Sequence, residues 1–292
     1  ATHLYARNDE SGGKLWLAEN PAHGSRMSED DDFEDEVSRD EIALRPDEAA
    51  DPQWLVDRKI PADLRVKYEV YSYRSAATIL AESHPEEFAE LCEALRAFMI
   101  TKTIIRTAGG NESDVPKVFS AFLRPKGWFE TIIRGDLLVE LISRVQVGFD
   151  AKGKPKTIPQ KRVIRRAKYL DGHKVDYVKG RVAFDLEWNS KDQTFDRDLY
   201  AFSAFAQTGV IDVGVLVTRG GTEMGDFIKG LGQSLTKSGE LEFTKSGAPR
   251  MVGAKYGAST TWMGKLLYRL NAGRHGACPV LVFGITPRCV TD

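Results

Sequence analysis

The order of strand-like and helix-like segments in residues 173–285 is the feature that most constrains the fold. Strand-like runs occur at 181–188, 210–217 and 278–285, of which the last two are mostly apolar. Between them lie two stretches in which apolar residues recur at three- and four-residue spacing, as on one face of a helix, at Thr194 to about Ala206 and about Thr260 to Asn271. Strands that alternate with helices pair in parallel through right-handed crossovers. The sequence therefore predicts an α/β protein.

An antiparallel hairpin is expected to begin this sheet. The strand-like runs His173–Val178 and Arg181–Trp188 are joined by Lys179-Gly180, which we interpret as a two-residue turn. The predicted fold is a mixed central β-sheet, an antiparallel hairpin plus parallel strands, flanked by helices on both faces. Helical spacing of apolar residues predicts two further helices, at about 83–99 and about 129–145.

The second strand of this hairpin carries acidic residues on one face. Side chains alternate along a strand, so Asp185 and Glu187 point away from the face of Val182, Phe184 and Leu186. With Lys179-Gly180 as the turn, Asp176 lies opposite Ala183 and diagonal to Asp185 on the same face.

Three carboxylates this close repel one another, and a hard divalent cation such as Mg²⁺ would neutralise them. The alternative is a solvent-exposed hairpin whose polar face is acidic by chance.

Charge divides the chain into an acidic tail and a basic body. Residues 28–53 carry twelve acids and two bases, and residues 1–27 carry three of each, so a net charge of −1 leaves +9 on residues 54–292. We expect residues 1–53 to be a disordered tail, in part resembling a vector-derived segment before Met27. Residues 54–292 are predicted to form a single domain. A basic body suggests a polyanionic partner, although a well-solubilised enzyme of any kind would also fit.

Residues 151–170 form a basic segment with eight Lys or Arg, two Pro and no acid. We predict an insertion that contacts nucleic-acid phosphates, with a solvated loop as the alternative. The residues proposed for this contact are Lys161, Arg162, Arg165 and Arg166.

Other features narrow the classes of protein. The longest apolar run has nine residues, 277–285, whereas a membrane-spanning helix needs roughly 20. The chain opens with no signal-peptide pattern, and its three cysteines form no CxxC pair. We therefore expect a cytoplasmic protein with no membrane association.

The sequence resembles the type II restriction endonucleases of the BglII, BamHI and BstYI group, within the PD-(D/E)XK nuclease superfamily. The resemblance covers most of residues 67–285. Its central motifs are Val175-Asp176-Tyr177, Lys179-Gly180-Arg181 and Phe184-Asp185-Leu186-Glu187-Trp188-Asn189-Ser190. The position that is commonly lysine in the superfamily is Glu187 here, as in the BamHI branch.

The resemblance implies a homodimer that uses Mg²⁺ to cut both strands of a short palindromic site in double-stranded DNA. Asp176 and Asp185 would bind the metal, and Glu187 would orient or deprotonate water or act as a further ligand. Trp128-Phe129-Glu130 is similar to a tryptophan-led segment that supplies an additional polar residue to the active site, which suggests Glu130 as a fourth candidate. Further DNA contacts are expected at Lys191, Ser259, Thr260 and Thr261. Two alternatives stay open: a repair or recombination nuclease of the same fold, and a DNA-binding protein without catalysis.

Overall fold

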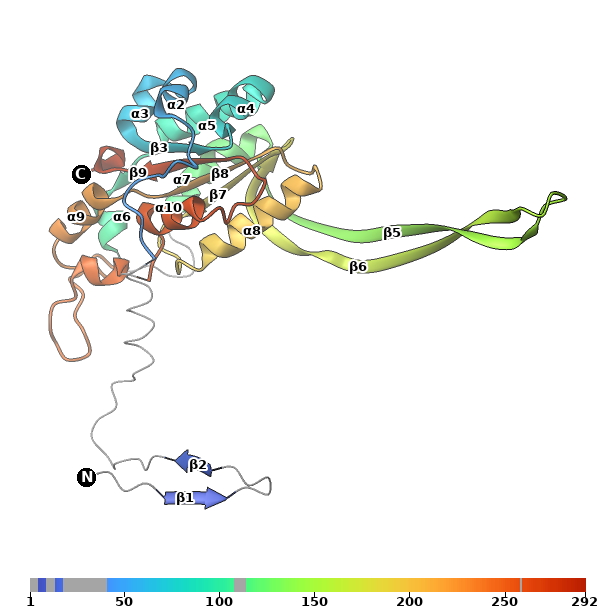
Figure 1. Ribbon diagram of the computed structural model, residues 1–292. Helices are drawn as coiled ribbons and strands as arrows, with labels where there is room; N and C mark the ends of the chain where they lie inside the picture. The colour runs from blue at the N-terminus through green and yellow to red at the C-terminus, as the bar shows by residue number, and fades with distance from the viewer. Residues whose placement is uncertain (1–4, 9–13, 18–40, 108–113, 258) are drawn as a thin grey trace.

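The computed structural model describes residues 5–8, 14–17, 41–107, 114–257 and 259–292. Its centre is a six-stranded mixed sheet with the strand order β3-β9-β8-β7-β6-β5 (Figure 1). The strands are β3 (Tyr68–Tyr73), β9 (Val280–Ile285), β8 (Val213–Arg219), β7 (Val182–Glu187), β6 (Pro155–Lys179) and β5 (Phe129–Phe149). Strands β7, β8 and β9 are mutually parallel, and the other neighbours are antiparallel. The predicted fold class is confirmed.

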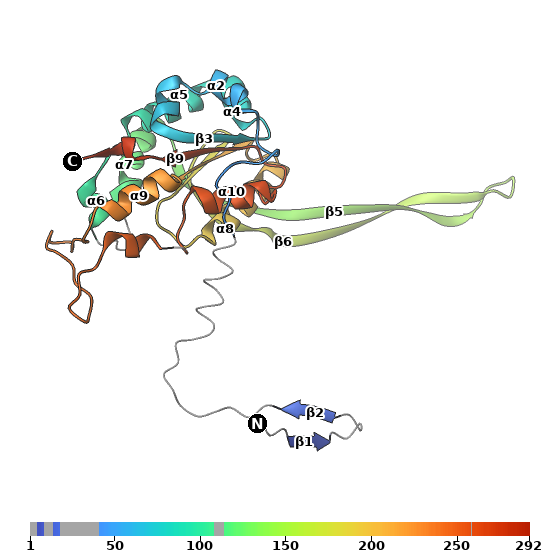
Figure 2. The same ribbon diagram turned by 60° about the vertical axis from the view of Figure 1, so that its left-hand side comes forward.

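Helices cover both faces of the sheet, so the central strands are buried on both sides. One face packs against α2 (Gln53–Lys59), α3 (Ala62–Lys67), α4 (Ala76–Ser83), α5 (Pro85–Ala97), α6 (Lys102–Arg106), α7 (Asp114–Leu123) and α9 (Thr222–Gly230). The other face packs against α8 (Thr194–Gln207) and α10 (Met263–Asn271), as Figures 1 and 2 show. None of the helices in the described residues is long and apolar enough to cross a membrane.

Short elements complete the described chain. Strands β4 (Ile100–Thr101) and β10 (Val290–Thr291) pair in parallel, and β1 (Tyr5–Asn8) pairs antiparallel with β2 (Lys14–Leu17). Short 3-10 helices cover Arg124–Lys126, Val252–Tyr256 and Pro287–Cys289 in the described residues.

The predictions of helices α8 and α10 are confirmed, and the helix expected at 83–99 is α5. The helix expected at 129–145 is wrong, because these residues form β5. Apolar residues there fall on both faces of the strand, so they also satisfy helical spacing. Many of them are β-branched, which favours a strand when a partner such as β6 is available.

Strands β5 and β6 continue far beyond the body as a two-stranded arm, which we define as residues 135–170. Figures 1 and 2 show this arm projecting away from the sheet. Its register runs from Gly135 opposite Leu170 to Phe149 opposite Pro155. The basic segment 151–170 is therefore the tip and the returning strand of the arm rather than a loop.

Residues 41–53, which we had assigned to the acidic tail, lie against the body. The backbone N–H of Ala43 donates to the carbonyl oxygen of Gly264 at 3.0 Å. The Asp51 carboxylate accepts hydrogen bonds from the Ser72 hydroxyl and the Ser75 backbone. These contacts place residues 41–53 on the body, while the acidic run 29–36 lies outside the described residues.

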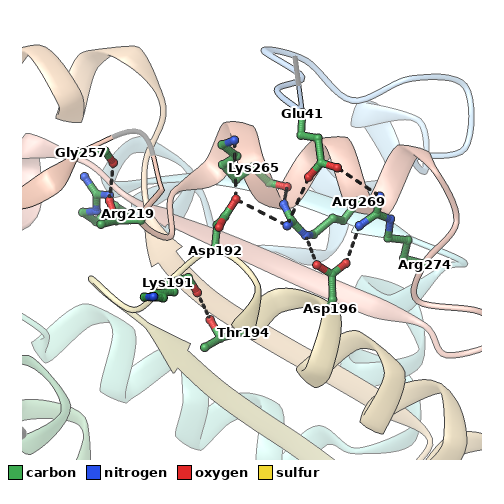
Figure 3. Close-up of polar contacts among 11 residues, drawn as sticks. Glu41, Lys191, Asp192, Thr194, Asp196, Arg219, Gly257, Lys265, Arg269 and Arg274 are labelled. Atoms are coloured by element: carbon green, nitrogen blue, oxygen red, sulfur yellow. Dashed lines mark hydrogen bonds and ion pairs between the residues drawn. The ribbon is translucent and has the colours of Figure 1, made fainter. Parts of the chain in front are cut away.

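Ion pairs fasten the N-terminal part of α8 to α10 (Figure 3). The buried guanidinium of Arg269 lies 3.0 Å from Asp196, 3.5 Å from Asp192 and 3.5 Å from Glu41, measured between nitrogen and carboxylate oxygen. Lys265, also buried, lies 3.6 Å from the same oxygen of Asp192. Buried charges are tolerated when they are paired in this way, and the pairs fix where α8 begins.

A glycine lets α8 approach the sheet closely. A Cβ atom built on Gly214 of β8 would lie 2.3 Å from Cδ2 of Phe202 in α8, closer than atoms can pack. The short distance between α8 and β8 therefore depends on residue 214 being a glycine, which has no side chain.

We expect the Gly214→Ala substitution to lower the free energy of unfolding by about 1–3 kcal/mol, the usual cost of overpacking a core. The control is Gly225→Ala in α9, where a Cβ would meet no atom within 4 Å. Alanine there should leave stability unchanged or raise it by up to about 1 kcal/mol. Urea unfolding of both variants measures the difference, and equal stabilities would contradict this account of the α8 packing.

Candidate active site

The hairpin that carries the acidic residues turns one residue later than we expected. The last pair is Lys179 opposite Val182, so the turn is Gly180-Arg181, and Gly180 adopts a φ of +55° that glycine tolerates. The pairs continue with Tyr177 opposite Phe184. Our expectation that Asp176 lies opposite Ala183 is therefore wrong, and this register brings Asp176 level with Asp185.

The carboxylates of Asp176 and Asp185 accept hydrogen bonds from backbone N–H groups across the hairpin. The N–H of Asp176 donates to Oδ1 of Asp185 at 2.7 Å, and the N–H of Leu186 donates to Oδ2 of Asp176 at 3.2 Å. Each carboxylate thus accepts a hydrogen bond from the opposite strand. This arrangement fixes both side chains where the regular pairing of β6 and β7 ends.

Three of the four predicted acids line one cleft of about 900 Å³. Glu130 at the start of β5, Asp176 on β6 and Glu187 at the end of β7 all contribute to its wall. Glu130 also forms an ion pair with Lys174 at 2.7 Å. Asp185 lies deeper and is 4% exposed. The structure therefore brings the predicted acids together, with Asp185 behind the wall of the cleft.

An aspartate and a histidine that pair with each other lie beside these acids. Asp198 on α8 is 1% exposed, and its Oδ1 lies 3.2 Å from Nε2 of His173 on β6. We had not proposed Asp198, although it lies three residues after Phe195 on the inward face of the predicted helix, where a charged residue is unusual. From the sequence, His173 is identified only as the first residue of a strand.

Burial and mutual repulsion raise the pKa values of these carboxyl groups. Loss of solvent is the largest cause for Asp176, followed by the neighbouring charges of Asp198 and Glu130. The same two effects, burial first and then Asp198 and Asp176, raise the pKa of Asp185 well above its usual value. Burial and Asp198 raise the pKa of Glu187 to about 7. A set of carboxyl groups with raised pKa values in a cleft is typical of a functional site.

The donor set suits a divalent cation. Oδ2 of Asp185, Oε2 of Glu187 and Oδ2 of Asp198 are buried and have no hydrogen-bond partner. Buried polar atoms without partners are rare in folded proteins, and an ion is one of the explanations. Oxygen ligands of this kind fit Mg²⁺ or a similar ion.

The loop after β7 lies beside the predicted Ser-Thr stretch. Lys191 forms a β-bridge with Thr260, and the backbone of Thr261 donates to the carbonyl oxygen of Ser190. The buried guanidinium of Arg219 joins the two segments by donating to the carbonyl oxygens of Trp188 and Thr261. Lys191, Ser259 and Thr260 thus form one exposed or half-exposed surface, while Thr261 is fully buried and lies outside it.

The four basic residues predicted to contact DNA divide between the two faces of the arm. Lys161 and Arg165 lie on one face, where they form ion pairs with Glu140 and Asp136. Arg162 and Arg166 lie on the other face, opposite Leu141 and Leu137, and no acidic partner contacts them among the described residues.

The mixed sheet and the acidic hairpin at the cleft define the restriction-endonuclease-like class of nucleases. A family model described as restriction endonuclease BglII/BglIII matches residues 68–285, which is 218 of the 292 residues. The chain therefore belongs to the BglII restriction endonuclease family. It is a type II site-specific deoxyribonuclease, and its substrate is DNA. No curated protein matches the chain.

The electrostatics of the cluster generate a prediction for Asp185→Asn. The amide oxygen can still accept the N–H of Asp176, while the buried charge is removed. Without divalent ions, we expect the variant to melt at least ~2 °C higher than the unchanged chain, equivalent to about 1 kcal/mol. Adding Mg²⁺ should raise the Tm of the unchanged chain more than that of the variant. Differential scanning calorimetry measures both shifts, and a lower Tm for the metal-free variant would contradict the predicted repulsion.

Proposed function

We propose that the chain is a Mg²⁺-dependent restriction endonuclease that cuts both strands of a short specific site in duplex DNA. The observation that carries this proposal is the set of buried carboxylate oxygens without hydrogen-bond partners beside the cleft. Such groups are costly without a cation, and family membership identifies the reaction as cleavage of DNA.

Asp176 and Asp185 are proposed to hold the Mg²⁺ ion. When bound, such an ion polarises the scissile phosphodiester and lowers the pKa of a coordinated water. The hydrogen bonds between the two strands orient these carboxylates before the ion arrives. This preorganisation limits the rearrangement that binding requires.

Glu187 is proposed to orient or deprotonate the attacking water. Its pKa of about 7 suits a group that exchanges a proton near neutral pH. Unlike the lysine common in the superfamily, it cannot place a positive charge beside the phosphate. Glu130 lines the same cleft, and its ion-pair partner Lys174 places a cation 2.7 Å from the Glu130 carboxylate.

DNA is proposed to be held at three places: the cleft, the surface of Lys191, Ser259 and Thr260, and the arm. The arm is suited to phosphate contact because its returning strand carries the basic residues. A two-fold symmetric site on DNA would be cut by a homodimer, one subunit for each strand. Within each subunit, we propose a single nuclease domain over residues 54–292, against which residues 41–53 pack.

A nuclease of the same fold that acts in repair or recombination would share this site. A plasmid assay separates the two, because a restriction endonuclease yields a fixed set of fragments from a given sequence.

Asp176→Ala should reduce Mg²⁺-dependent cleavage of plasmid DNA by at least ~100-fold, because a ligand of the catalytic ion is lost. The matched control is Asp226→Ala, which removes an exposed carboxylate on α9 that does not line the cleft. The control should cleave at the unchanged rate. Cleavage by Asp176→Ala within a few-fold of the control would refute the proposed site.

The arm allows a comparison of its two faces. Replacing Arg162 and Arg166 together with Gln should lower the slope of log affinity against log salt by roughly 1.8, about 0.9 for each phosphate contact. Replacing Lys161 and Arg165 with Gln should lower it less, because Glu140 and Asp136 already offset these charges.

Fluorescence anisotropy with a duplex at several salt concentrations measures both slopes. Equal slopes in the unchanged chain and the Arg162/Arg166 variant would exclude phosphate contact by that face of the arm.

A further inference from the structure

Three side chains from different elements converge behind the wall of the cleft. His173 on β6, Asp185 on β7 and Asp198 on α8 each offer one ligand atom, and these atoms lie within 4.8 Å of one another. Ligands of one divalent ion lie about 3–4 Å apart when metal–ligand distances are about 2.1 Å. A shift of less than an ångström in each side chain would therefore bring all three atoms to coordination distance of one ion.

We propose that His173, Asp185 and Asp198 bind a divalent transition-metal ion, such as Mn²⁺ or Co²⁺. The inference depends on the proposed function only through Asp185, whose carboxylate would be shared with the Mg²⁺ site of the cleft. His173 and Asp198 are ligands that this cleft site does not use.

Unpartnered atoms point to a ligand at this place. Asp185 and Asp198 are 4% and 1% exposed, and Oδ2 of each has no hydrogen-bond partner. An ion pair between His173 and Asp198 alone would use Oδ1 of Asp198 and leave both of these Oδ2 atoms unsatisfied. A single cation between the three residues can contact both carboxylates and the imidazole.

Neighbouring basic residues pair with Glu130 and Asp198 and leave Asp185 without an ion pair in the described part of the chain. Lys174 points to Glu130, with its nitrogen 2.7 Å from the Glu130 carboxylate. The guanidinium of Arg197, whose side chain is 60% exposed, forms an ion pair with Oδ1 of Asp198 at 3.5 Å and leaves Oδ2 of Asp198 without a partner. Neither residue has an ion pair with Asp185 in the described part of the chain.

The histidine determines which ion the site would prefer. Imidazole nitrogen is a common ligand of first-row transition metals, whereas Mg²⁺ takes oxygen ligands almost exclusively. With one nitrogen and two carboxylates, the site should bind Mn²⁺ and Co²⁺ more tightly than Mg²⁺. The cleft site, built from carboxylates alone, should show this preference more weakly.

The test is Mn²⁺ binding to the full chain without DNA, followed by pulsed electron paramagnetic resonance. A coordinated imidazole gives a ¹⁴N modulation that carboxylate and water ligands do not. We expect this modulation in the unchanged chain and its loss in His173→Gln, together with at least ~10-fold weaker Mn²⁺ binding. The control is His84→Gln, since Nε2 of His84 also lies 3.2 Å from an aspartate, Asp212, but away from the cluster. The control should keep the modulation.

Absence of ¹⁴N modulation in the unchanged chain, or its persistence in His173→Gln, would overturn the proposal. If His173→Gln does not fold, Asp198→Asn decides: weaker Mn²⁺ binding supports the site, and unchanged binding excludes it. The result is independent of the cleavage assay. Loss of cleavage in Asp176→Ala without any ¹⁴N modulation would preserve the proposed function and reject this inference, whereas cleavage by Asp176→Ala would reject the proposed function itself.

Discussion

The crowding of carboxylates between β6, β7 and α8 is the constraint on which the rest of the structure depends. Asp176, Asp185, Glu187 and Asp198 are held close together and largely out of water, which raises the pKa values of the first three. A fold keeps such an arrangement only when other interactions outweigh its cost. Here the backbone hydrogen bonds of the hairpin and the ion pairs at the start of α8 do so.

Helix α8 packs against the sheet and also carries a residue of the acidic cluster. Its position is set on one side by Gly214, which permits close contact with Phe202, and on another by the ion pairs of Arg269. The same helix carries Asp198 to the acidic cluster. The loop that precedes it joins β7 to the surface formed by Lys191, Ser259 and Thr260. A change in the packing of α8 would therefore alter the cleft and the proposed DNA surface together.

Much of the fold could be predicted from the sequence, because its strands and helices follow clear periodic patterns. The alternation in β7 predicted the acidic face, and the apolar runs predicted the parallel strands. The arm could not be predicted, since a ribbon with two exposed faces has no single apolar side, and β5 therefore satisfied the spacing of a helix. The predicted turn, Lys179-Gly180, is one residue earlier than the turn in the structure, Gly180-Arg181, because glycine can occupy either central position of a two-residue turn. Asp198 was missed because its partners are distant in sequence, at His173 and Asp185.

The most direct test of the central claim is the location of bound metal in a crystal of the chain with a cognate duplex and Mn²⁺, observed by anomalous scattering. If Asp176 and Asp185 hold the metal, an ion lies about 2.0–2.2 Å from their carboxylate oxygens. Ordered carboxylates with no anomalous peak between them, in crystals grown at millimolar Mn²⁺, would contradict the claim that this acidic cluster is a metal centre.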